Sequence, residues 1–238
     1  MSMRTAAILP VKRFARAKRR LGASVADPLR MDLARAMVGD VLMALHESIS
    51  ITQTLVVTRE DSVAAAARYQ GALIVEDTAE DGQSAAVALG VERALTEGFE
   101  RVLCIPGDCP ALDPAELDPL LNGSGAETVI VPDRHGTGTN GLLLTPPDVF
   151  SVSFGPDSFA RHRQLARNAG VDCRVERPPS LLLDIDTGED LAVLRERLAG
   201  EDRARAMRTR RVIMSAQPSG VAQAGVAHAS TGAAHPRP

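Results

Sequence analysis

Aromatic residues make up only 3% of the 238-residue chain, which contains no tryptophan and one tyrosine. Proteins that bind single-stranded nucleic acids need aromatic side chains on which bases can stack. The net charge of −3 also provides no general attraction to phosphate backbones or anionic membranes. The composition therefore argues against nucleic acids and membranes as partners, and an anionic ligand would need local clusters of basic residues.

The chain has three cysteines, Cys104, Cys109 and Cys173, and their spacing fits neither a zinc site nor a redox-active pair. No apolar run approaches the roughly 18–20 residues of a membrane span. The apolar run near the N-terminus is too short for a signal peptide. We therefore expect reduced thiols in a cytoplasmic protein.

Short apolar segments alternate with segments of helical periodicity, which predicts an α/β fold with a mostly parallel, mixed sheet and helices on both faces. Strands are expected at residues 6–11, 51–58, 72–75, 101–106, 128–131, 142–145, 171–175 and 181–185. Helices are expected at residues 28–46, 61–69, 84–97, 157–169 and 188–198, with a further helix opening at residue 114. Ligands of such sheets bind beyond the carboxyl ends of the strands, so the loops there are the places to look for chemistry.

One domain is expected to span residues 1–200. The composition changes near residue 201, and the end of the chain is rich in alanine, glycine, serine and proline. Residues 201–238 are therefore predicted to be a largely disordered extension.

Three aspartates follow two of the expected strands. Asp108 comes after an apolar strand and a glycine turn, and Asp184 and Asp186 form a D-x-D pair at the end of another. Alternation along an extended chain directs both carboxylates of the pair to one side, where Mg²⁺ would relieve their repulsion. Alternatively, Asp108 caps the next turn, and Asp186 or Thr187 caps the helix at residue 188.

A basic loop follows the first expected strand, with six positive charges in the nine residues 12–20. Neither a G-x-G-x-x-G motif nor a Walker lysine loop is present, so the lysine and arginine side chains of this loop would have to neutralise a bound triphosphate. Alternatively, the loop is simply a solvated basic surface.

Two further loops carry groups suited to anions. Residues 136–140 read GTGTN, in which glycines let backbone amides approach a ligand and threonines supply hydroxyls. A helix expected from residue 157 would offer its N-terminus as a second anion site. The alternative for the first loop is a flexible surface turn, and for His162 on the second we favour ordinary packing or solvent exposure.

Five segments, LPVKRFARAKRRL, PGDCPAL, PDRHGTGTNGLLL, FGPDSFARH and DIDTGEDL, occur in this order across residues 9–191. Together they resemble the guanylyltransferases that act on phosphoenolpyruvate or 2-phospho-L-lactate in the biosynthesis of coenzyme F-420. The resemblance implies a nucleotide-diphospho-sugar-transferase-like fold. It also implies GTP and a phosphorylated three-carbon acid as substrates, with Mg²⁺ as cofactor.

The resemblance also assigns roles to residues. It implies metal binding by Asp108, Asp184 and Asp186, contact with the three-carbon acid by Thr139, Gly155 and Ser158, nucleotide binding by Pro10, Lys12, Arg13, Lys18, Gly82 and Ser84, and catalysis by Lys12, Lys18 and Asp108. The chain has Gly82-Gln83-Ser84 where relatives commonly carry Gly-Leu-Asn, so the contact at Ser84 departs from the family pattern.

The expected chemistry needs no side-chain base, because a phosphate monoester with a second pKa near ~6 is mostly dianionic at pH 7. Phosphoenolpyruvate is the preferred acid, since the alanine- and arginine-rich composition is typical of actinobacteria, with 2-phospho-L-lactate and 3-phosphoglycerate as alternatives. More distant possibilities are a sugar-nucleotide transferase or D-x-D glycosyltransferase of the same fold and a noncatalytic nucleotide-binding regulator. A homodimer is the expected oligomer.

Overall fold

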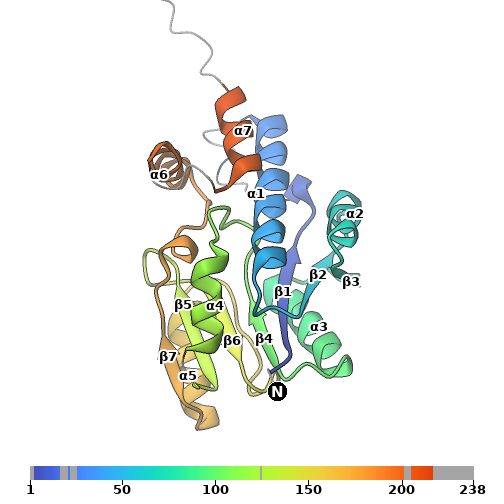
Figure 1. The fold of residues 1–238 in the computed structure, drawn as a ribbon, viewed down its shortest axis with the longest axis vertical. Coiled ribbons are helices and arrows are strands. Elements are labelled where there is room, and N and C mark those ends of the chain that lie inside the picture. Colours follow the sequence, from blue (N-terminus) through green and yellow to red (C-terminus); the bar gives the residue numbers. More distant parts are fainter. Residues whose placement is uncertain (1–2, 17–20, 22–25, 124, 201–204, 217–238) are drawn as a thin grey trace, which may run out of the picture.

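The computed structural model describes residues 3–16, 21, 26–123, 125–200 and 205–216. Strands and helices alternate along most of these ranges (Figure 1). The strands are β1 (Thr5–Val11), β2 (Gln53–Thr58), β3 (Leu73–Glu76), β4 (Arg101–Cys104), β5 (Thr128–Pro132), β6 (Thr139–Leu144) and β7 (Cys173–Val175). The α-helices are α1 (Asp27–Glu47), α2 (Asp61–Tyr69), α3 (Gln83–Thr96), α4 (Pro114–Asn122), α5 (Ser158–Ala169), α6 (Gly188–Ala199) and α7 (Met207–Ser215), and short 3-10 turns are η1 (Phe14–Arg16) and η3 (Pro179–Leu181).

The strands form one seven-stranded sheet in the order β3-β2-β1-β4-β6-β5-β7. Strands β1 to β4 are mutually parallel, β6 is antiparallel to both of its neighbours, and β5 pairs with β7 in parallel. The predicted mostly parallel, mixed sheet is thereby confirmed. In this arrangement the carboxyl ends of β1 and β4 lie beside the start of β6. The loop after β1, the loop after β4 and the loop before β6 therefore meet at one edge of the sheet.

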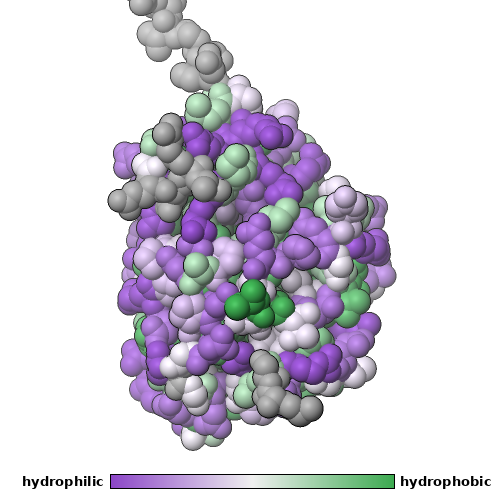
Figure 2. Space-filling model, in the orientation of Figure 1, coloured by the Kyte–Doolittle hydropathy of each residue, from purple (hydrophilic) through white to green (hydrophobic). Residues whose placement is uncertain are grey.

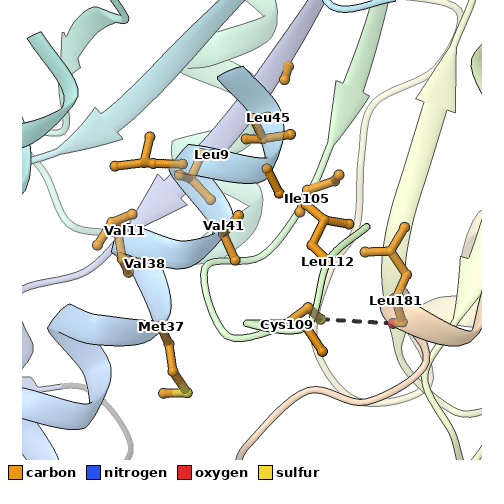
Figure 3. Close-up of a cluster of buried hydrophobic side chains, with 14 of the residues drawn as sticks. Leu9, Val11, Met37, Val38, Val41, Leu45, Ile105, Cys109, Leu112 and Leu181 are labelled. Carbon is orange, nitrogen blue, oxygen red and sulfur yellow. Dashed lines mark hydrogen bonds between the residues drawn. The ribbon is translucent and has the colours of Figure 1, made fainter. Parts of the chain in front are cut away.

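Alternate residues of the central strand β1 face two separate cores. Leu9 and Val11 belong to the core formed with α1, α2, α4 and α6, whereas Ile8 belongs to the core on the other face, where α3 packs. Figure 3 shows Leu9 and Val11 beside Val38 and Val41 of α1. Full burial of each such side chain contributes roughly 1.5–3 kcal/mol to the stability of the fold. Both faces of β1 therefore help to pack the sheet against the helices that cover it.

The expected strand at residues 181–185 is wrong. Leu181 ends η3, Leu182 has a helical backbone conformation, and residues 182–186 belong to no strand of the sheet. The apolar residues Leu181, Leu183 and Ile185 are buried in the core on the α1 face, and Cys109 contacts the Leu181 carbonyl there (Figure 3). The alternating apolar residues here therefore reflect burial against the core and not pairing within the sheet.

The predicted C-terminal extension contains a helix that the sequence did not indicate. Helix α7 lies against α1 (Figure 1), and its first turn is capped from α1: the Asp40 carboxylate accepts the backbone N–H groups of Arg208 at 3.0 Å and Thr209 at 2.8 Å. Thr209 is fully buried at this contact. Residues 201–204 and 217–238 of the predicted extension lie outside the described ranges.

The outer surface of the α1 layer is largely hydrophilic, with apolar side chains in small groups (Figure 2). Ile49, just after α1, is one exposed apolar residue, with 90% of its surface accessible. Within the described ranges, no helix is both long and apolar enough to cross a lipid bilayer.

Candidate active site

Three aspartates from two distant segments meet beyond the carboxyl end of β4. One ligand oxygen each from Asp108, Asp184 and Asp186 lies within 4.8 Å of the others. The segments are joined through the backbone, because the Ile185 N–H donates to the Asp108 carbonyl oxygen at 3.0 Å. The structure thus brings together the three carboxylates that the sequence singled out, although the second segment is not a strand.

Gly107 allows this approach. A Cβ at residue 107 would lie 3.0 Å from a methyl carbon of Val38 on α1, which is closer than side chains normally pack. The glycine therefore lets the chain turn tightly between α1 and the sheet as it leaves β4. The next residue, Asp108, enters the site from that turn.

The electrostatics of the cluster favour a cation. The pKa of Asp184 is raised to about 6 by burial and by the neighbouring Asp108 and Asp186 charges, while the hydrogen bond from the Asn140 amide acts in the opposite direction. That amide donates to Asp184 Oδ1 at 3.1 Å and to the Leu181 carbonyl at 2.8 Å. Partly buried carboxylates in close contact are the donor set that hard divalent cations such as Mg²⁺ prefer, so these residues fit a metal ion.

The helices next to the cluster are capped by other residues, one of which is Thr187, as one of the sequence-based alternatives expected. Asp113 caps α4 by accepting the Ala115 N–H at 2.9 Å, as its position before a proline predicts. Thr187 caps α6 in a capping box with Asp190. Neither helix uses the carboxylate of Asp108 or Asp186 as its cap.

Asp190 also holds the D-x-D segment in place. Its Oδ2 accepts the backbone N–H groups of Asp186 at 3.1 Å and Thr187 at 2.7 Å, and its Oδ1 pairs with Arg134 at 2.7 Å. Burial by itself would raise the pKa of Asp190, but these hydrogen bonds and the Arg134 charge outweigh burial and lower it. An ionised Asp190 therefore fixes the backbone beside Asp186 and ties it to the loop after β5.

A cavity of about 720 Å³ opens over the carboxylates. Its lining comes from the ends of β1 and β4, the beginning of β6, the starts of α3 and α5, and the D-x-D segment. The lining residues that the sequence singled out are Pro10, Lys12, Asp108, Thr139, Gly155, Ser158, Asp184 and Asp186. One cavity thus joins the expected metal, nucleotide and acid residues.

The remaining expected nucleotide residues lie elsewhere. Arg13 pairs with Glu80 at 3.5 Å, and Gly82 precedes α3 with a φ of 106°; neither residue lines the cavity. Ser84 also stays outside the lining, and its Oγ accepts the backbone N–H of Phe154 at 2.8 Å. Lys18 lies outside the described residues.

Several polar residues of the cavity lining were not among the predicted site residues. Asp77, Gln83 and Asn140 are three of them. Asn140 stands inside the GTGTN motif, so its position beside Thr139 was the available signal. Asp77 and Gln83 belong to the turn between β3 and α3 and the start of α3, where the sequence carries no pattern that separates a lining residue from a solvated one.

The acid-binding side of the cavity is built from the start of β6 and the start of α5. Gly155 has a φ of 108°, a conformation that residues with a side chain rarely adopt, and Ser158 is the first residue of α5. Asp157 before it makes no side-chain capping bond, which leaves the α5 N-terminus suited to an anion.

His162, one turn into α5, is fully buried. Of the two expectations for this residue, packing is therefore confirmed and solvent exposure is wrong. Its ring also makes hydrogen bonds that the sequence did not indicate, one of them to Thr139 at 3.0 Å.

Comparison with known proteins agrees with this geometry. A model of the family described as "Guanylyl transferase CofC like" matches residues 5–226. A phosphoenolpyruvate guanylyltransferase from Conexibacter woesei is 48% identical over 200 residues, covering 83% of this chain and 90% of the relative. A 2-phospho-L-lactate guanylyltransferase from Methanothermobacter thermautotrophicus is 34% identical over 189 residues, covering 79% of this chain and 83% of the relative.

Solved structures support the fold. A protein assigned as a nucleotide-diphospho-sugar transferase from Desulfovibrio desulfuricans G20 superposes with a TM-score of 0.72 at 19% identity, covering 90% of this chain and 95% of that one. The predicted nucleotide-diphospho-sugar-transferase-like fold is confirmed.

Proposed function

Because the chain belongs to the family of CofC-like guanylyl transferases, we propose that it transfers GMP from GTP to phosphoenolpyruvate and releases pyrophosphate. The product would be enolpyruvoyl-2-diphospho-5'-guanosine, a precursor of coenzyme F-420. The observation that carries the proposal is the convergence of three carboxylates, a lysine and the α5 N-terminus on one cavity.

The cavity has groups for two anionic substrates. Lys12, at the end of β1, lies where the triphosphate of GTP would be neutralised, and Lys18 and Arg13 of the same basic loop are proposed to add charge there. Thr139, Gly155 and Ser158 stand on the α5 side and would receive the phosphorylated acid. Gly82 and Ser84, at the start of α3, are the other nucleotide residues that the family resemblance implies, and Ser84 is also linked to the loop before α5 because it accepts the Phe154 N–H.

In the proposed reaction an oxygen of the acid's phosphate attacks the α-phosphorus of GTP. A bond forms between them, the bond from the α-phosphorus to the bridging oxygen breaks, and pyrophosphate leaves with that oxygen. The attacking phosphate is mostly dianionic at pH 7, so no side chain has to remove a proton. The protein's contribution is to align the two anions and offset their repulsion.

Mg²⁺ is the proposed cofactor, held by Asp108, Asp184 and Asp186, and when bound it would neutralise phosphate charge as the reaction proceeds. The arrangement of the chain supports this role, since the Asn140 amide holds the Asp184 carboxylate and the Ile185 N–H joins the two segments that carry the aspartates. Preorganised charge of this kind costs no rearrangement during the reaction.

Phosphoenolpyruvate is preferred as the acid because the relative at 48% identity carries that name. The relative named for 2-phospho-L-lactate is 34% identical, and 3-phosphoglycerate is the third candidate. We further propose that the enzyme acts in the cytoplasm and that it is a homodimer. Light scattering of the purified protein would give its mass and so check the dimer.

A substrate panel tests the proposal. Purified protein with Mg²⁺ and GTP is given phosphoenolpyruvate, 2-phospho-L-lactate, 3-phosphoglycerate or glucose 1-phosphate, and pyrophosphate release is followed. Phosphoenolpyruvate is expected to give the highest kcat/KM. Release with glucose 1-phosphate alone would point to a sugar-nucleotide transferase, and GTP binding without release would point to a regulator.

A further inference from the structure

His162 is a fully buried residue of α5 whose two ring nitrogens both make hydrogen bonds. Nε2 accepts the backbone N–H of Ser153 at 3.0 Å, and Nδ1 lies 3.0 Å from Thr139 Oγ1. The residue thus bridges the loop before α5 and the first residue of β6, and both segments line the acid side of the cavity.

The Ser153 contact determines where the ring carries its proton. A backbone N–H can only donate, so Nε2 has to be unprotonated to accept from it. A neutral imidazole carries one N–H, which must then be on Nδ1. His162 therefore donates to the Thr139 hydroxyl oxygen.

The ring is kept neutral by its surroundings. The pKa of His162 is lowered to about 4, mainly because the ring is buried and also because the positive charge of Arg161 lies nearby. The ring of Phe154 meets the imidazole edge-on with centroids 4.9 Å apart, and Phe150 lies 6.4 Å away. Both aromatic rings lie near the imidazole, whose Nδ1 lies beside Thr139 Oγ1.

The consequence concerns the Thr139 hydroxyl. Once its oxygen accepts from His162, the hydroxyl still has its own proton to donate, and Thr139 lines the cavity together with Gly155 and Ser158. An anionic oxygen of a ligand in the cavity would accept this proton from the Thr139 hydroxyl. Such a hydrogen bond to a charged group is stronger than one between neutral groups.

We propose that His162 is a positioning residue that fixes the Thr139 hydroxyl with its proton directed at the phosphorylated three-carbon acid. The inference rests on the proposed function, because it names how one acceptor-binding group of that reaction is oriented. His162 touches no substrate itself and acts through Thr139 and through the Ser153 backbone.

Three substitutions at residue 162 separate its two contacts. His162→Asn places an amide nitrogen near the Nδ1 position and can still donate to Thr139, whereas His162→Gln places its amide near the Nε2 position and can still accept from Ser153. His162→Leu keeps neither contact. Thr139→Val removes the hydroxyl at nearly constant shape, and His46→Gln on the exposed end of α1 is a control with no contact to this network.

The steady-state readout is the KM of each substrate. His162→Gln and Thr139→Val are expected to raise the KM for the acid roughly 10- to 100-fold, the loss expected for one hydrogen bond to a charged group, and to change the KM for GTP less than about 3-fold. His162→Asn should recover most of the acid affinity. The double variant His162→Gln with Thr139→Val should be no worse than Thr139→Val alone. Equal rises in both KM values, or additive effects in the double variant, would overturn the proposal.

A second measurement does not depend on activity. ¹⁵N NMR of the histidine ring nitrogens at pH 7 should show His162 protonated at Nδ1 only. Protonation at Nε2 would overturn the inference even if the enzyme is active. If the wild-type protein released no pyrophosphate with any acid, the proposed function would fail, and the NMR result would still decide the orientation of the hydroxyl.

Discussion

The backbone N–H of Ile185 donates to the carbonyl oxygen of Asp108 at 3.0 Å. This bond joins the loop after β4 to the D-x-D segment, which are more than seventy residues apart in the chain. Because each segment carries a carboxylate of the cluster next to this bond, the bond holds the backbones of the aspartates close together. The main chain thus contributes to the approach of the three carboxylates.

Removing one carboxylate should abolish metal-dependent turnover. Asp184→Asn keeps the shape and the Asn140 contact region but removes a negative ligand, and we expect kcat/KM to fall roughly 100-fold or more, since metal coordination supplies several kcal/mol of stabilisation. Pyrophosphate release as a function of Mg²⁺ concentration measures this. Asp32→Asn, at an exposed surface pair with Arg35, is the control and should leave turnover unchanged. Unchanged turnover in Asp184→Asn would defeat the metal assignment.

Asp190 offers a test of how the D-x-D segment is positioned. Asp190→Ala removes the acceptor for the Asp186 and Thr187 amides, so we expect a loss of about 1–3 kcal/mol in unfolding free energy and a higher Mg²⁺ requirement. Glu189→Ala removes the other partner of Arg134, a pair in which the glutamate side chain is 78% exposed, and should cost less than about 1 kcal/mol. Urea unfolding compares the two; equal losses would show that Arg134 pairing, and not the backbone contact, is what matters.

His162 should make the stability of the protein depend on pH. Its pKa of about 4 in the folded protein is below the value of roughly 6.5 in an unfolded chain, so the unfolded chain binds the proton first as the pH falls. The stability is therefore complete above about pH 6.5 and is lost progressively as the pH falls toward 4. Relative to His162→Asn, the wild type should lose about 1–2 kcal/mol between pH 7.5 and pH 5. Parallel pH profiles for the two proteins would contradict this account.

Ser84 tests whether the start of α3 acts on the nucleotide directly or through the neighbouring loop. Because its hydroxyl accepts the Phe154 N–H at 2.8 Å, Ser84→Ala should loosen the loop before α5 and raise the KM for the acid by about 3- to 10-fold, the equivalent of one ordinary hydrogen bond. Ser62→Ala, on the exposed surface of α2, is the matched control. A rise confined to the KM for GTP would show that Ser84 contacts the nucleotide.

The parts of the fold that local chemistry specifies were predictable. Alternating apolar segments and capping residues such as Asp113 predicted the strands and helices, and the carboxyl ends of the strands predicted where Asp108 would lie. The segment at residues 181–185 could not be distinguished from a strand in the sequence, because alternating apolar residues report burial and carry no information about which backbone partner is present. Leu183 and Ile185 satisfy that pattern against the core instead.

Other features depend on residues far away in the chain. The first turn of α7 is capped by Asp40 on α1, and α7 has no capping side chain of its own, so no local pattern could have indicated it. The contact of His162 with Thr139 likewise depends on how α5 packs against β6, and a lone histidine in a helical segment does not reveal it.

The most direct measurement is ³¹P NMR of the reaction of the wild-type protein with GTP, phosphoenolpyruvate and Mg²⁺. Attack at the α-phosphorus predicts free pyrophosphate together with a new pair of coupled diphosphate resonances that join the acid to GMP, and neither should form with Asp184→Asn. Formation of GDP in place of pyrophosphate, or no new diphosphate with any of the three acids, would contradict guanylyl transfer at this site.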